Sequence, residues 1–214
     1  MRPLPPENVD LILLNGLVLT LDENDRRFQS GGVAMASSEI VAVGPSDVIQ
    51  AGYRARRTLD CSGCVVMPGL VNSHTHAAMT LFRGLADDLP LMEWLHEHIF
   101  PAEAKLTEEW VYWGSLLACA EMILSGTTTF CDMYLFEHKV AEAAKAAGIR
   151  AVVGEVLYDF PSPNYGPAEN GLRFTELLIE AYAGDPLVRI AVEPHALYTC
   201  SPDLLARCHE LAIK

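Results

Sequence analysis

Two histidines separated by one residue, His74 and His76, are the side chains in this sequence best suited to metal chemistry. They follow a mostly apolar run, residues 65–73. On an extended strand, side chains at positions i and i+2 point to the same face, so the two imidazoles are predicted to stand side by side. That geometry suits two ligands of one metal ion, although two ligands alone do not define a metal site. The alternative is a pair of ordinary core or surface histidines.

The cysteines offer a weaker chemical signal. Cys61 and Cys64 have CxxC spacing, but no second CxxC follows and no thioredoxin-like pattern surrounds them. The other four cysteines lie in apolar stretches and are predicted to be small core residues. This cysteine usage favours a reducing compartment, and we predict a cytoplasmic location.

Composition excludes several classes of protein. The 214 residues are 50% hydrophobic and 20% charged, which is typical of a globular protein. The net charge of −13 argues against a nucleic-acid partner, because such proteins need a basic face. No apolar stretch reaches the roughly 18–20 residues of a membrane span, so no membrane association is expected. Prolines and acidic residues after Arg2 are unlike a signal peptide.

The first part of the chain has a β pattern. Apolar runs at residues 11–14 and 17–21 flank Asn15-Gly16, which is a strong hairpin signal. Two further runs, at residues 32–35 and 40–44, flank another short turn. We therefore predict that residues 1–64 are the N-terminal part of a small β-sandwich module.

From residue 65 onward, strands and helices alternate. The predicted helices have clear end signals: Thr107 and Ser201 as N-caps, and Gly148 as a C-cap. The expected strands are residues 65–73, 127–132, 150–158 and 188–192. The expected helices are residues 106–125, 137–147, 172–183 and a last one from 202.

Four βα units in a row favour a parallel sheet or barrel. The strands end at polar residues such as His76, Asp132, Asp159 and His195, and a (β/α)8 barrel builds its site at those strand ends. An open doubly wound sheet tends to carry a glycine-rich turn after its first strand, and none is present. We predict that residues 65–214 are the first half of a (β/α)8 TIM-like barrel, truncated after about four units. The alternative is a complete four-unit α/β domain.

The sequence resembles the amidohydrolase superfamily, in the branch that includes 5-methylthioadenosine/S-adenosylhomocysteine deaminases, guanine deaminases and triazine chlorohydrolases. The resemblance spans most of residues 60–204, with its motifs in the right order. The matching segments are residues 68–84 (PGLVNSHTHAAMTLFRG), 93–95, 101–103, 106–107, 121–122, 125–129, 132–133 and 194–201.

This resemblance implies a site for one divalent metal, Zn²⁺ with Fe²⁺ as the alternative. His74 and His76 match the first two ligands. The other ligands and the proton-shuttling glutamate are expected beyond Lys214, so no catalytic residue is predicted within this chain. His195 stands where binuclear members carry a carboxylated lysine, which favours a single metal ion.

The implied reaction is hydrolytic deamination of an adenosine-like nucleoside. A metal ion makes hydroxide available, which attacks the amine-bearing ring carbon, and ammonia leaves. Glu103 matches a glutamate that binds ribose hydroxyls, and His195 matches a histidine that contacts the purine ring. Trp94 is a candidate pocket wall. The alternatives are a solvated acid, a buried histidine and a core tryptophan, respectively. The partner is a small amino-purine nucleoside or related heterocycle, and a homo-oligomer is expected.

One position departs from the family pattern. Members that accept S-adenosylhomocysteine carry an arginine near the end of the third strand, and Glu155 is predicted to stand there. A carboxylate would repel the substrate carboxylate unless it faces the helices. Arg173 is the nearest candidate for a second expected arginine. Methylthioadenosine, 5′-deoxyadenosine and adenosine thus stay open. So do guanine, pterin or triazine hydrolysis, and a catalytically incomplete fragment or assembly partner.

Overall fold

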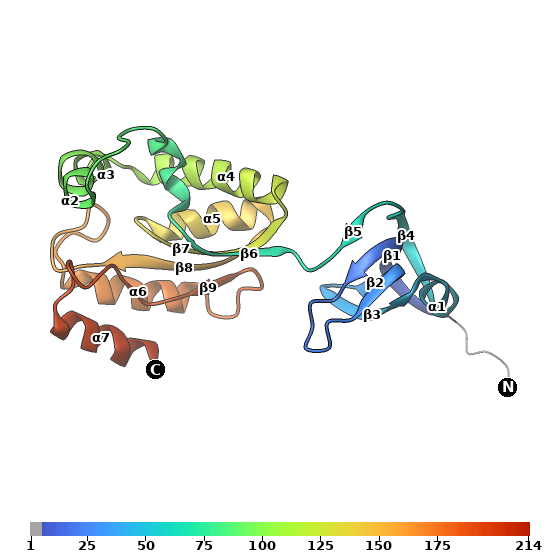
Figure 1. Ribbon diagram of the computed structural model, residues 1–214. Helices are drawn as coiled ribbons and strands as arrows, with labels where there is room; N and C mark the ends of the chain where they lie inside the picture. Colours follow the sequence, from blue (N-terminus) through green and yellow to red (C-terminus); the bar gives the residue numbers. More distant parts are fainter. Residues whose placement is uncertain (1–5) are drawn as a thin grey trace. The chain divides into compact units, whose positions relative to one another are not determined.

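The computed structural model describes residues 6–214 as two compact units, divided between Pro68 and Gly69 (Figure 1). The boundary predicted from the sequence lies between residues 64 and 65. No helix among residues 6–214 combines the length and apolar character needed to cross a membrane.

The N-terminal unit is one five-stranded sheet with a short helix. Its elements are β1 (Glu7–Leu19), β2 (Arg27–Ala36), β3 (Glu39–Pro45), α1 (Ser46–Gly52), β4 (Tyr53–Asp60) and β5 (Val65–Val66). The order is β3-β2-β1-β4, and β4 and β5 run parallel to successive parts of β1. All five strands join a single sheet, with Ile49 of α1 packed against Ile12 and Ala34. That this sheet is part of a sandwich, as predicted from the sequence, stays a prediction.

The hairpin predicted at Asn15-Gly16 is wrong, because β1 continues through both residues. Asn15 takes a left-handed conformation with φ 66°, and the pairing with β2 shifts register on both sides of Gly16. A Cβ on Gly16 would lie 2.8 Å from Cγ2 of Val66 in β5. The dipeptide therefore forms an irregularity that lets a neighbouring strand approach closely.

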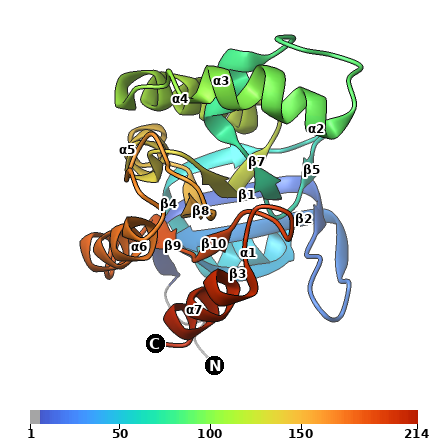
Figure 2. The same ribbon diagram turned by 90° about the vertical axis from the view of Figure 1, so that its left-hand side faces the viewer.

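The C-terminal unit is a parallel sheet with helices between its strands (Figures 1 and 2). The strand order β6-β7-β8-β10 follows the chain, with β9 also paired to β8. This is the sequential order expected for the first four strands of a barrel. The strands are β6 (Leu70–Thr75), β7 (Thr127–Tyr134), β8 (Arg150–Leu157), β9 (Val188–Ile190) and β10 (Glu193–Pro194). The longer helices are α4 (Glu108–Leu124), α5 (Glu137–Ala147), α6 (Asn170–Ala181) and α7 (Pro202–Ala212).

The predicted strand at residues 65–73 is split between the two sheets. Its beginning is β5, and its end belongs to β6, which continues to Thr75. Pro68 has no N–H for a strand ladder. Gly69 passes so close to Thr128 that a Cβ would lie 2.1 Å from Oγ1 of that residue. The break therefore falls at these two residues.

The predicted helix ends are confirmed. Oγ1 of Thr107 accepts a hydrogen bond from N–H of Trp110 at 3.3 Å, and Oγ of Ser201 accepts one from N–H of Leu204 at 3.2 Å. Gly148 ends α5 with φ 73°, a left-handed conformation that favours glycine. These local signals set where α4 and α7 begin and where α5 ends.

A helical excursion connects β6 to α4. Its elements are η1, a 3-10 helix (Ala77–Phe82), α2 (Leu91–Glu93), η2, a π-helix (Trp94–Ile99), and α3 (Phe100–Glu103). Leu95 and Ile99 are buried and anchor the excursion. It carries Trp94 and Glu103 to the carboxyl end of the sheet.

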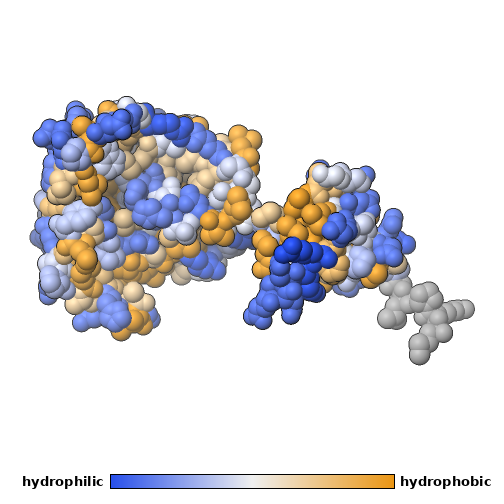
Figure 3. Space-filling view, in the orientation of Figure 1, coloured by the Kyte–Doolittle hydropathy of each residue, from blue (hydrophilic) through white to orange (hydrophobic). Residues whose placement is uncertain are grey.

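Apolar side chains also reach the surface of this unit (Figure 3). Among the described residues, β6 pairs only with β7, and Leu70 and Val71 on it are 49% and 67% exposed. The main core lies elsewhere, where α4 and α5 pack on β7 and β8 around Phe130, Val140 and Val153. The sheet thus has a well-packed centre and an open edge.

Candidate functional site

The carboxyl ends of the parallel strands surround one hollow of about 200 Å³. His76 and His195 line it from the sheet, and Trp94 and Glu103 reach it from the helical excursion. His74 lies on β6, two residues before His76, and its ring is next to that of His76. The structure therefore brings together the five side chains singled out in the sequence.

The two histidines are arranged as the strand alternation predicts. Their ring centroids are 5.0 Å apart, with the ring planes at 76°. Nδ1 of His76 lies 2.6 Å from the carbonyl oxygen of Met133. A carbonyl only accepts, so Nδ1 carries the proton and Nε2 keeps a free lone pair. Burial lowers the pKa of His76 and favours the neutral form that binds metals.

Two buried carboxyl groups stand behind this pair. Oδ1 of Asp132 accepts a hydrogen bond from N–H of Ala77 at 2.7 Å, which holds the backbone immediately after His76. Burial raises the pKa of Asp132 to about 7. Burial and the neighbouring Asp132 charge raise the pKa of Glu137 well above its usual range. Because two adjacent buried carboxylates repel each other, the raised pKa favours a protonated Glu137 beside Asp132.

The helical excursion supplies an acidic and an aromatic group. Glu103, the last residue of α3, lines the hollow close to the hydroxyl of Tyr134. Burial raises the pKa of the Glu103 carboxyl to about 7, and the Tyr134 hydroxyl offsets part of that rise. Trp94 is half-buried and contributes to the same wall. A carboxylate in this position can accept hydrogen bonds from ligand hydroxyls.

His195 follows β10 on the opposite side of the hollow. Its Nδ1 lies 2.8 Å from Oγ1 of Thr199, and that hydroxyl donates to the carbonyl of Ala196 at 3.1 Å. The hydroxyl proton is therefore used, so Nδ1 of His195 donates and Nε2 is free to accept. Burial lowers the pKa of His195 and keeps it neutral. The ring stands edge-on to Tyr158, with centroids 6.3 Å apart.

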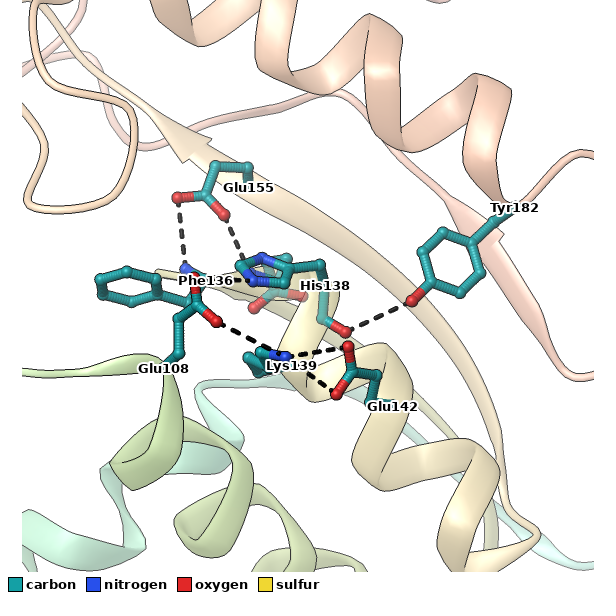
Figure 4. A network of polar contacts seen from close by, with 8 residues as sticks. Glu108, Phe136, His138, Lys139, Glu142, Glu155 and Tyr182 are labelled. Atoms are coloured by element: carbon teal, nitrogen blue, oxygen red, sulfur yellow. Dashed lines mark hydrogen bonds and ion pairs between the residues drawn. The ribbon is translucent and has the colours of Figure 1, made fainter.

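Of the two orientations that the sequence leaves open for Glu155, the structure has the one that faces away from the substrate. Glu155 is fully buried, and its carboxylate accepts hydrogen bonds from N–H of Phe136 at 3.3 Å and of Glu137 at 2.9 Å. Figure 4 shows this carboxylate turned toward the backbone at Phe136. Val156, the next residue, lines the hollow instead. Alternate residues of a strand face opposite sides, so Glu155 points to the helices and does not repel a ligand.

Two larger hollows, of about 410 and 320 Å³, adjoin the first and share Phe100 with it. Their walls are mostly apolar and include Phe100 and Phe160, and Phe160 stacks on Tyr158 with centroids 3.8 Å apart. Among the described residues, no lysine or arginine lines any of the three. Arg173, the candidate named from the sequence, lies exposed on α6 beside Glu176.

Sequence reasoning missed Tyr134, Glu137 and Thr199. A signal for Tyr134 was present, because it lies two residues after Asp132 and so faces the same side of β7. Glu137 acts on Asp132, and Thr199 acts on His195. The spacing of these residues in the sequence does not indicate either contact.

The metal-binding capacity of the described residues is limited to the histidine pair. Among residues 6–214, no three histidine, cysteine, aspartate or glutamate side chains come together in a way that would hold a metal ion. His74 and His76 fit as two ligands, since Nε2 of His76 is free. Catalytic zinc sites use three protein ligands.

Comparisons with known proteins agree on one family. The sequence profile of the amidohydrolase family matches residues 65–214. A protein of Syntrophobacter fumaroxidans named 5-methylthioadenosine/S-adenosylhomocysteine deaminase is 75% identical over 205 residues, which are 96% of this chain and 47% of that protein. This chain thus spans about half the length of the curated relatives it matches.

Solved structures match the same region. The crystal structure of an adenosine deaminase from Xanthomonas campestris with bound zinc superposes with a TM-score of 0.93 at 38% identity, over 98% of this chain and 48% of that one. An atrazine chlorohydrolase from Arthrobacter aurescens TC1, complexed with zinc, superposes with a TM-score of 0.82 over 95% of this chain and 50% of that one. At 22% identity the second match supports the fold alone.

Proposed function

The chain belongs to the amidohydrolase family, and on that basis we propose that the intact protein is a metal-dependent hydrolytic deaminase of adenosine-like nucleosides. The observation that carries the proposal is the convergence of His76, Glu103 and His195 on one hollow at the strand ends. The names of the relative from Syntrophobacter fumaroxidans and of the Xanthomonas campestris structure support the reaction class.

In this proposal His74 and His76 are two ligands of one divalent metal ion. Zinc is the first candidate, because neutral imidazoles suit it and the Xanthomonas campestris structure contains it, and iron is the alternative. The remaining ligands must come from outside residues 6–214. When bound, the cation lowers the pKa of water and makes a hydroxide nucleophile available near neutral pH.

The other residues bind and orient the nucleoside. Glu103 accepts hydrogen bonds from the ribose hydroxyls, and Trp94 closes the wall beside it. Nε2 of His195 accepts a hydrogen bond from an N–H of the amino-heterocycle. The tautomer set by Thr199 leaves Nε2 free for this contact.

The substrate range in this proposal includes methylthioadenosine, 5′-deoxyadenosine and adenosine. S-adenosylhomocysteine is no longer disfavoured by Glu155, because that carboxylate points away from the hollow. The aromatic and apolar walls of the adjoining hollows suit a methylthio group. A cytoplasmic location and a homo-oligomeric state stay predictions.

The test is ammonia release combined with metal analysis of the intact gene product. We expect one metal ion per chain and ammonia from methylthioadenosine or adenosine, with little from guanine, a pterin or a triazine. Stoichiometric metal without ammonia from any adenosine-like nucleoside would contradict the proposal. Preference for guanine, a pterin or a triazine would favour another reaction of this family. Absence of both metal and activity would favour the incomplete fragment or assembly partner.

A further inference from the structure

Tyr134, the last residue of β7, is a buried tyrosine with an unusual hydroxyl. The residue is only 5% exposed, yet its hydroxyl, which lies near the Glu103 carboxyl, forms no hydrogen bond of normal geometry with the described residues. The side chain lines the hollow together with Glu103 and His76, and its ring centroid lies 6.0 Å from that of His76. Nothing in the sequence motifs or the comparisons assigns it a role.

Other tyrosines of this unit use their hydroxyls within the fold. Tyr165, which is 9% exposed, donates to the carbonyl of Val156 at 3.1 Å. Tyr182 donates to the carbonyl of His138 at 3.3 Å. A buried hydroxyl without a partner destabilises the folded state. The arrangement at Tyr134 is explained by a hydrogen bond between its hydroxyl and a bound ligand.

The chemistry of the neighbours defines that ligand. Burial and the Glu103 charge raise the pKa of Tyr134, so the phenol stays neutral and can donate one hydrogen bond and accept another. The Glu103 carboxyl beside it accepts hydrogen bonds once ionised. Two such groups on one wall match a ligand with two adjacent hydroxyls. Tyr134 can form a hydrogen bond with one hydroxyl and Glu103 with the other.

We propose that Tyr134 is a specificity-determining residue that binds one hydroxyl of the substrate's vicinal diol while Glu103 binds the other. This inference rests on the proposed nucleoside deaminase function. The phenol forms its hydrogen bond with the sugar hydroxyl, and no covalent step is involved.

The test compares Tyr134→Phe with the intact wild-type protein on adenosine, 2′-deoxyadenosine and 3′-deoxyadenosine. We expect kcat/KM for adenosine to fall roughly tenfold, mainly through KM, as for the loss of a buried hydrogen bond. At least one deoxynucleoside is expected to be nearly unaffected, because it lacks the hydroxyl that Tyr134 binds. Tyr165→Phe is the matched control, since it removes a buried phenol hydroxyl of a residue that does not line the hollow, and it should leave the ratios between substrates unchanged.

Thermal stability without substrate provides a second readout. Removing a hydroxyl without a partner is expected to leave the Tm of Tyr134→Phe unchanged or raised, whereas Tyr165→Phe should lower it. Unchanged ratios between the three substrates in Tyr134→Phe would overturn the inference while leaving the deaminase function intact. A wild-type protein that deaminates none of the three would overturn the proposed function and this inference with it.

Discussion

The two walls of the candidate site are built in different ways. The strand wall, formed by His74, His76 and Asp132, contains two short hydrogen bonds to backbone groups: His76 bonds to the Met133 carbonyl of β7, and Asp132 accepts from N–H of Ala77, the first residue of η1. The helical wall, residues 77–103, carries Trp94 and Glu103 on 3-10, π and short α-helical turns. Its ties to α4 include a bond from Oγ1 of Thr80 to the Gly114 carbonyl at 2.8 Å and an exposed ion pair.

This difference matches two tasks, metal binding and substrate binding. The groups suited to hold a metal ion stand on a rigid sheet with their orientation determined by directed contacts. The groups suited to meet a substrate stand on an irregular segment held largely by apolar packing around Leu95 and Ile99. We therefore expect changes in the strand wall to affect metal binding and changes in the helical wall to affect substrate choice.

The largest effect is expected from His76→Ala. Losing a ligand should reduce metal affinity by more than the 10–100-fold typical of groups that only orient a ligand, and activity should vanish with the metal. Metal content and ammonia release measure both. His209→Ala, at an exposed position on α7, is the control. Full metal occupancy in His76→Ala would contradict the claim that the strand wall binds the metal ion.

The next effect is expected from Asp132→Ala. It removes the acceptor for N–H of Ala77 and leaves that buried group unpaired, which destabilises the fold by about 1–3 kcal/mol. Because the same contact positions the chain after His76, metal affinity should fall about 10–100-fold. Urea unfolding and metal titration check the two numbers. A loss of stability with unchanged metal affinity would limit Asp132 to a structural role.

A smaller, pH-dependent effect is expected from the Asp132–Glu137 pair. A carboxyl whose pKa rises on folding, from 3.8 to about 7 for Asp132, adds stability at low pH and loses it as the pH rises through the folded value. The Tm of the intact protein should therefore fall as the pH rises from 3.8 to about 7. Glu137→Gln keeps a donor toward Asp132 without a titrating proton and should make the fall shallower.

The matched control for this experiment is Glu142→Gln, an exposed position on the same helix. It should leave the slope of Tm against pH unchanged. If Glu137→Gln had the wild-type slope, the two carboxyls would not share a proton.

The smallest effect is expected from Arg83→Ala on the helical wall. Arg83 forms a bidentate pair with Glu121 at 3.0 and 2.7 Å, but both side chains are exposed. Exposed pairs contribute little, so the urea midpoint should stay within experimental error. A clear loss of stability, or of metal, would show that the helical wall depends on directed contacts as the strand wall does.

Much of this arrangement was predictable from local signals. The histidine pair, the strand-helix alternation and the caps at Thr107, Gly148 and Ser201 depend on spacing and on backbone geometry near each residue. They need no knowledge of distant contacts. The barrel order β6-β7-β8-β10 follows because short βα connections place successive parallel strands side by side.

The wrong hairpin at Asn15-Gly16 and the open orientation of Glu155 have a common physical cause in contacts between distant residues. Asn15-Gly16 is a strong turn signal, but close approach of Val66 makes it an irregularity within a strand. Glu155 and Val156 are adjacent, and a shift of one residue in strand register reverses which of them faces the hollow. Neither outcome can be read from the local sequence, because β5 and the backbone at Phe136 decide them.

The proposed metal site consists of His74 and Nε2 of His76 as two ligands of one ion. The direct test is a crystal structure of the intact protein with anomalous diffraction measured at the zinc absorption edge. We predict one anomalous peak about 2.0–2.1 Å from a ring nitrogen of His74 and from Nε2 of His76, with Nδ1 of His76 still bonded to the Met133 carbonyl. A peak away from this pair, or one bonded through Nδ1 of His76, would contradict the claim.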